Sequence, residues 1–116
     1  MFLSHVQRWE VLTATVVVVD LDGWQAVCAN VGDSRAVLAH FDHTEGSDKE
    51  RIVVQALTED QKPDLPAEEE RILACGGYVS PASPQFGPPR VWVRQGEGPG
   101  LAMARSIGDH VCKHVG

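Results

Sequence analysis

The chain has 116 residues, of which 43% are hydrophobic and 22% are charged, and its formal net charge is −6. This composition is typical of a globular domain and excludes a disordered or collagen-like chain. Because the sequence contains neither a run of about 18 apolar residues nor a cluster of lysines and arginines, we expect no membrane span and no nucleic-acid partner. The absence of a signal-peptide pattern and of paired cysteine motifs favours an intracellular protein of the cytoplasm or nucleus.

Short valine-rich segments near the N-terminus predict β-strands, because each is bounded by turn residues. The predicted strands cover residues 14–19, 24–31 and 36–39, followed by a fourth at 51–57. The turns Asp20-Leu21-Asp22-Gly23 and Gly32-Asp33-Ser34 suit tight reversals, so a β-meander is expected. The first three strands do not alternate between apolar and polar residues, and both of their faces are therefore expected to be covered.

One helix is predicted to begin at Pro66 and to end before Gly76-Gly77, with three glutamates near the positive end of its dipole. A helix of about nine residues is too short to cover a sheet that is apolar on both faces. The proline-rich residues 80–89 predict a loop, and residues 90–94 alternate as in a strand. Residues 101–107 are ambiguous between strand and helix.

Six sequence blocks follow one another in an order that is more informative than any single block. They are residues 13–18, 29–38, 57–63, 70–77, 90–91 and 101–109. Together they resemble the protein phosphatase 2C family, the metal-dependent serine/threonine phosphatases, from about residue 12 to residue 116. A lone Gly32-Asp33-Ser34-Arg35 would be weak evidence, whereas the order and spacing of all six blocks are specific.

The resemblance implies an α+β fold, namely a partial α/β/β/α β-sandwich of the PPM-type phosphatase fold with antiparallel strands and a flanking helix. It implies a hydrolase that dephosphorylates phosphoserine and phosphothreonine in phosphoprotein substrates, and a monomeric parent. In the complete domain, two Mn²⁺ or Mg²⁺ ions would lower the pKa of a bridging water and hold the phosphoryl oxygens for in-line attack. A second sheet and further helices would cover the apolar strands.

The resemblance implies that Asp33 is a ligand of an additional, weaker metal. An aspartate in a turn also commonly organises that turn through its own side chain, and both roles stay open. Gln61 stands where the family often has histidine, within a block that is implied to be mainly a structured turn. Other residues that match the family's motifs are expected to be structural: Gly32, Ser34, Arg35, Asp60, Lys62, Pro63, Gly76, Gly77, Arg105, Gly108 and Asp109.

The segment between Gly77 and Leu101 corresponds to a flap beside the active site of the family. The resemblance therefore makes Phe86, Arg90 and Trp92 candidates for contacts with substrates or regulators. Packing of Trp92 on its own strand is the plainer alternative.

The main metal-ligand blocks of the family have no counterpart in this sequence. These blocks read Asp-Gly-His-Gly-Gly, Asp-Gly-hydrophobic-Trp-Asp and Asp-Asn, whereas Asp22-Gly23 is followed by Trp24. No catalytic residue is therefore assigned, and residues 1–116 are expected to form an incomplete phosphatase domain that is inactive alone. The alternative is a non-catalytic regulatory or interaction module that keeps the scaffold without its metal centre.

A rival metal site is suggested by His110-x-Cys112-x-His114, whose side chains would share one face of a strand. A structural zinc site needs a fourth ligand, and the sequence offers none at a suitable spacing. Cys28 and Cys75 are expected to act as small buried hydrophobes rather than as catalytic thiols.

Overall fold

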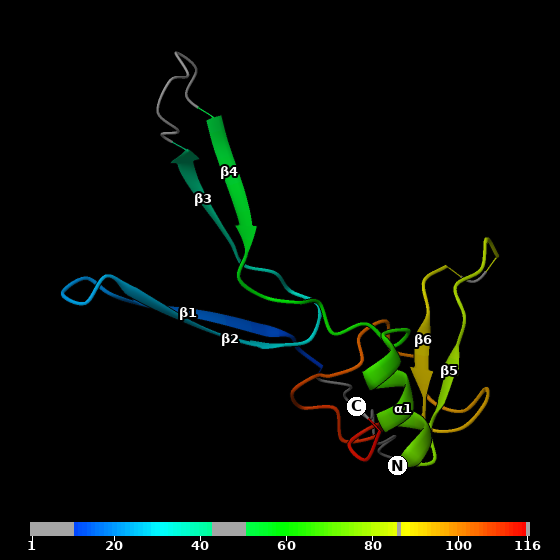
Figure 1. Cartoon of the computed structure of the whole chain (residues 1–116). Coiled ribbons are helices and arrows are strands. Elements are labelled where there is room, and N and C mark those ends of the chain that lie inside the picture. Colours follow the sequence, from blue (N-terminus) through cyan, green and yellow to red (C-terminus); the bar gives the residue numbers. More distant parts are fainter. Residues whose placement is uncertain (1–10, 43–50, 86, 116) are drawn as a thin grey trace, which may run out of the picture.

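The computed structural model describes residues 11–42, 51–85 and 87–115. Its strands pair as three antiparallel two-stranded sheets, β1 with β2, β3 with β4, and β5 with β6 (Figure 1). Antiparallel pairs with one helix confirm the predicted α+β class. The elements in chain order are β1 (Ala14–Asp20), β2 (Gln25–Val31), β3 (Val37–Asp42), β4 (Arg51–Ala56), α1 (Pro66–Ala74), β5 (Tyr78–Ser80) and β6 (Arg90–Trp92).

The first hairpin forms as predicted. Its register runs from the pair Ala14 and Val31 to the pair Asp20 and Gln25. At the turn, the Asp20 carboxylate accepts a hydrogen bond from the backbone N–H of Asp22 at 3.1 Å. Such a contact with the backbone two residues on is the reason that aspartate favours turns.

The predicted β-meander is wrong, because β3 pairs with β4 and not with β2 in the part of the chain described. The residues after β2 leave the sheet at Gly32, whose φ of 98° lies in the left-handed region. The polar groups at the end of β2 then bond to the segment that follows β4: the Asn30 side chain donates to the carbonyl of Glu59 at 3.3 Å. A loop contact therefore takes the place of the expected strand contact.

Both N-terminal hairpins project away from the rest of the molecule (Figure 1). Their valine side chains are largely uncovered. Val18 is 62% exposed, Val27 68% and Val54 62%. Within residues 11–42 and 51–56, these strand faces are thus left uncovered, as expected for strands whose cover is a second sheet and helices that the sequence does not supply. The sequence pattern of buried strands and this exposure together indicate surfaces that fit further protein layers.

Helix α1 begins and ends as predicted. Pro66 lies in its first turn, and Gly76 adopts a φ of 80° after its last turn. The backbone N–H groups of Gly76 and Gly77 donate to the carbonyls of Leu73 and Ile72 at 3.0 and 2.9 Å. These bonds satisfy carbonyls that a helix end would otherwise leave without a partner.

The hydrophobic core lies between α1, the β5–β6 sheet and the C-terminal segment. Strand β5 was not predicted, since three residues after two glycines give too short a pattern. Residues 101–107 form neither a strand nor a helix and instead make isolated bridges through Leu101 and Ile107. No described helix is long and apolar enough to cross a bilayer. The fully buried core side chains are Ile72, Val91, Ala104, Cys112 and Val115.

The cysteines test this packing through their reactivity. Cys112 is fully buried, and burial together with the nearby Asp109 carboxylate raises the pKa of its thiol to about 12. The expectation that Cys28 and Cys75 are buried is wrong, because Cys75 is exposed and Cys28 is half-buried. Because the thiolate is the reactive form, we expect iodoacetamide at pH 8 to label Cys75 and to spare Cys112 in the native chain. Mass spectrometry after timed labelling measures both sites. If Cys112 were labelled at the same rate before and after addition of urea, the C-terminal segment would not be packed on α1.

Candidate functional site

Three of the matched sequence blocks meet at one junction at the base of the first hairpin. Gly32 lies against the Thr13 side chain and the Arg105 carbonyl, since a Cβ added to it would come within 2.2 Å of Thr13 Cγ2 and 3.2 Å of Arg105 O. The Thr13 and Ser34 hydroxyls are 2.6 Å apart. Leu12 and Ile107 exchange backbone hydrogen bonds of 3.1 and 2.9 Å. The junction therefore joins residues distant in sequence into one polar centre.

Two ion pairs cross between the turn at residues 32–35 and the loop at residues 58–63. The Lys62 ammonium donates to the Asp33 carboxylate. The Arg35 guanidinium donates through Nε and Nη2 to both oxygens of Asp60, at 2.9 and 2.8 Å. This two-point hydrogen bond, helped by the positive charge of Arg35, lowers the pKa of the Asp60 carboxyl. The effect of burial opposes the shift and is smaller than that of the hydrogen bond. Asp33, Arg35, Asp60 and Lys62 are thus brought together.

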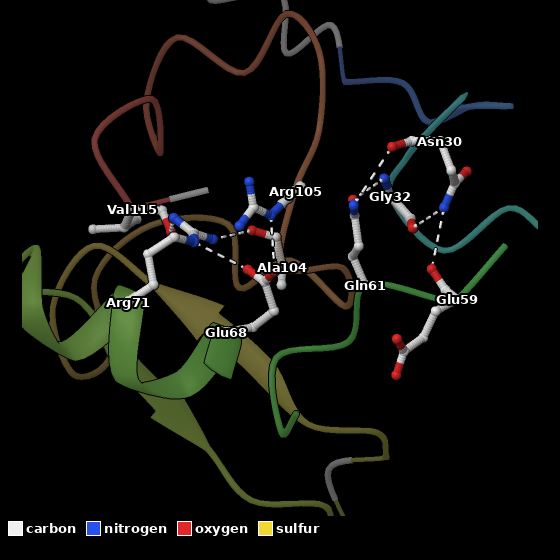
Figure 2. A network of polar contacts seen from close by, with 9 residues as sticks. All are labelled: Asn30, Gly32, Glu59, Gln61, Glu68, Arg71, Ala104, Arg105 and Val115. Atoms are coloured by element: carbon white, nitrogen blue, oxygen red, sulfur yellow. Dashed lines mark hydrogen bonds and ion pairs between the residues drawn. The ribbon is translucent and has the colours of Figure 1, made fainter. Parts of the chain in front are cut away.

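Gln61 connects this junction to two other parts of the chain (Figure 2). Its side-chain oxygen accepts from the Gly32 N–H at 2.7 Å, and its backbone N–H donates to the Gly32 carbonyl at 3.0 Å. Its own carbonyl accepts from the Ala104 N–H at 2.7 Å. A neutral carboxamide at this position therefore suits the turn, and Pro63, two residues further on, is fully buried.

A second polar network ties α1 to the C-terminal segment (Figure 2). Glu68 accepts from Arg105 Nε at 2.8 Å and from Arg71 Nε at 3.0 Å. Arg71 also donates to the carbonyls of Ala104 and Val115 at 2.8 and 3.0 Å. Burial alone would raise the pKa of Glu68, but the hydrogen bonds from Arg105 and Arg71, together with their charges, hold it below the ordinary value.

The flap candidates lie apart from the junction. Arg90 donates to the Gly100 carbonyl at 2.6 Å, and the Trp92 indole N–H donates to the Ser80 hydroxyl at 3.0 Å. Both residues line a cavity of about 460 Å³ together with Tyr78 and Pro81. Phe86 lies outside the described residues. Trp92 thus packs within its own sheet, while contacts of the flap with substrates or regulators stay a prediction.

The remaining motif residues support the C-terminal segment. Asp109 is 8% exposed, and its Oδ1 accepts from the N–H groups of Val111 and Cys112 at 3.0 and 3.1 Å. Gly108 adopts a φ of 89°. Because residues 108–115 form bends and turns rather than a strand, His110, Cys112 and His114 do not share a strand face. Gly76 and Gly77 end α1.

The described residues do not fit the metal centre that the resemblance implies. Hard divalent cations take several oxygen ligands, commonly two or more carboxylates. Among the residues the structure describes, no three His, Cys, Asp or Glu side chains are placed to hold a metal ion. The Asp33 carboxylate, the candidate ligand, is paired with Lys62. The role of Asp33 at an additional metal site stays a prediction.

Sequence reasoning missed two residues that organise the site. Glu68 was expected only to face the helix dipole, and Gln61 only to occupy a turn. The spacing of Glu68 and Arg71, three residues apart on a helix, is a signal for an ion pair on one helix face. No sequence pattern indicated the role of Gln61, because its partner Gly32 is distant in sequence.

Comparison with known proteins agrees with the arrangement of these blocks. Residues 6–115 match the family model for protein phosphatase 2C. The chain is 50% identical over 90 residues to "Probable protein phosphatase 2C 48" of Oryza sativa subsp. japonica, which is 78% of this chain and 25% of that protein. It is 50% identical over 88 residues to "Probable protein phosphatase 2C 34" of Arabidopsis thaliana, covering 76% of this chain and 23% of that protein.

A third relative, "Probable protein phosphatase 2C 64" of Oryza sativa subsp. japonica, is 44% identical over 103 residues, or 89% of this chain and 23% of its own length. No solved structure gives a significant match. The chain thus spans about a quarter of the length of the curated relatives it matches. On the match of residues 6–115 and these identities, the chain belongs to the protein phosphatase 2C family.

Proposed function

We propose that this chain is part of a protein serine/threonine phosphatase that hydrolyses phosphoserine and phosphothreonine in phosphoproteins. The observation that carries the proposal is the family match over residues 6–115. The family is metal-dependent, and we propose Mn²⁺ or Mg²⁺ as the metal because oxygen ligands suit hard divalent cations. A monomeric intracellular parent is part of the same proposal.

Within such a phosphatase, the described residues would supply scaffold rather than the reacting groups. The crossed ion pairs and Gln61 hold the turn at residues 32–35 against the loop at residues 58–63. The exposed valines of β1 and β2 offer apolar faces to further layers of the domain. Residues 1–116 would then form an incomplete domain that does not catalyse hydrolysis alone.

A second candidate is a non-catalytic regulatory or interaction module that keeps the phosphatase scaffold. Two observations favour it: Asp33 is paired with Lys62, and the described residues place no three His, Cys, Asp or Glu side chains to hold a metal ion. This candidate differs from the first in one respect that can be measured, namely whether the segment supports catalysis within a complete phosphatase.

A chimera separates the two candidates. Residues of this chain replace the matching segment of "Probable protein phosphatase 2C 48", to which they are 50% identical. Release of phosphate from a phosphothreonine peptide is measured with Mn²⁺ or Mg²⁺ and with chelator. The rice protein itself is the control.

We expect a metal-dependent phosphatase activity within about tenfold of the rice control. If the control is active while the folded chimera is not, the segment does not support catalysis, and the non-catalytic module is favoured instead. Comparison of the Mn²⁺ and Mg²⁺ arms identifies the metal that supports the reaction.

A further inference from the structure

The charges of the junction alternate along both of its segments. On the turn after β2, Asp33 is followed two residues later by Arg35, and on the loop after β4, Asp60 is followed by Lys62. The two segments pair in crossed order, Asp33 with Lys62 and Arg35 with Asp60. Opposite charges therefore meet at both positions, and sliding either segment by two residues would bring like charges together.

The Asp33 carboxylate is placed by contacts on both sides. The preceding Gly32 is bonded to Gln61 through both its N–H and its carbonyl. The following Ser34 hydroxyl lies 2.6 Å from that of Thr13. The side chains of Asp33 and Lys62 are 24% and 37% exposed, so their pair is partly shielded from water. An ion pair in such a setting is screened less by salt than a fully exposed one.

We propose that Lys62 is the cation of Asp33 in this chain, and that Asp33 ties the turn to the loop instead of binding a metal ion. The Lys62 ammonium is bonded to Asp33 Oδ2, so a metal ion at this carboxylate would either displace the ammonium or lie beside its positive charge. Like charges a few ångströms apart repel, which weakens cation binding. The proposal concerns the residues of this chain and does not depend on phosphatase activity.

Binding of Mn²⁺ to the purified 116-residue chain tests this assignment. The free-ion electron paramagnetic resonance signal measures bound Mn²⁺ in the wild type, D33N, K62M and D33N/K62M. The matched control is K113M, which removes the same charge from an exposed lysine of the C-terminal segment. We expect D33N to leave the Mn²⁺ affinity of the wild type unchanged. K62M should tighten binding at one site by about tenfold, and D33N/K62M should lose this gain.

A second readout uses the wild-type chain alone and so does not depend on the folding of a variant. The acetylation rate of Lys62 is followed by mass spectrometry, with Lys113 as the internal reference. Lys62 must leave the Asp33 carboxylate to meet the reagent, so a metal ion that took its place would speed the acetylation. Because the proposal places no metal ion at Asp33, millimolar Mn²⁺ should not change the acetylation rate of Lys62. A rise of several fold on adding Mn²⁺, at Lys62 and not at Lys113, would mean that the metal displaces the ammonium and would overturn the proposal. Weaker Mn²⁺ binding in D33N than in the wild type would overturn it as well.

Discussion

Replacement of Gly32 with alanine is expected to destabilise the chain by about 3 kcal/mol, because it combines backbone strain with a steric clash. Gly32 adopts a φ of 98°, which L-residues rarely adopt. An added Cβ would also lie 2.2 Å from Thr13 Cγ2 and 2.6 Å from Thr13 Cβ. Thr13 cannot easily yield, since its hydroxyl is bonded to Ser34 and Leu12 is bridged to Ile107.

Gly76 provides the matched control for this substitution. It also has a positive φ, of 80°, but an added Cβ there meets no atom within 4 Å. G76A should therefore cost about 1 kcal/mol, from backbone strain alone. Urea unfolding followed by circular dichroism measures both variants. Equal losses for G32A and G76A would show that the contacts of Gly32 with Thr13 and Arg105 do not form.

Replacement of Glu68 with alanine is expected to cost about 3 kcal/mol, because it leaves two arginines at the edge of the core without their anion. The Glu68 side chain is 12% exposed and bonds to Arg71 and Arg105. Arg71 also holds the carbonyls of Ala104 and Val115. Loss of the anion should thus loosen the C-terminal segment from α1. Protease cleavage after Arg105 or Lys113 in E68A, measured against the wild type, reports this loosening.

The pH dependence of this network has a definite sign. The pKa of Glu68 is lower in the folded chain than its ordinary value of 4.5. Its contribution is therefore fully present above about pH 4.5 and is lost as the pH falls through the lower folded value. E68Q keeps the shape without the charge. The stability difference between the wild type and E68Q should shrink below pH 4.5, and a difference that persists unchanged at pH 2 would contradict the ion pairs.

Local patterns predicted most of the secondary structure. The valine-rich runs and their turns gave strands that match β1 to β4 within a few residues, and Pro66 and Gly76 placed both ends of α1. Strand β5 was missed because it has only three residues and owes its existence to pairing with β6. The meander was wrong because pairing between strands depends on distant contacts, here those of Asn30 with Glu59 and of Gly32 with Gln61, that no local pattern contains.

The candidate site likewise depends on distant contacts that local patterns do not contain. The residue types at Asp33, Asp60 and Lys62 were evident from the family's motifs, but their partners were not. Which carboxylate meets which cation follows from the crossed approach of two segments about 25 to 29 residues apart in the chain. The pairing of Asp33 with an ammonium could therefore be found only from the structure, as could the role of Gln61.

Phosphate release from a phosphothreonine peptide by the purified 116-residue chain tests the account most directly. The assay uses Mn²⁺ or Mg²⁺, each with and without chelator, and the metal ions without protein as the baseline. Because no three side chains among the described residues are placed to hold a metal ion, and the Asp33 carboxylate is paired with Lys62, we predict no release above the baseline. Metal-dependent release that chelator abolishes and that D33N lowers would contradict the account.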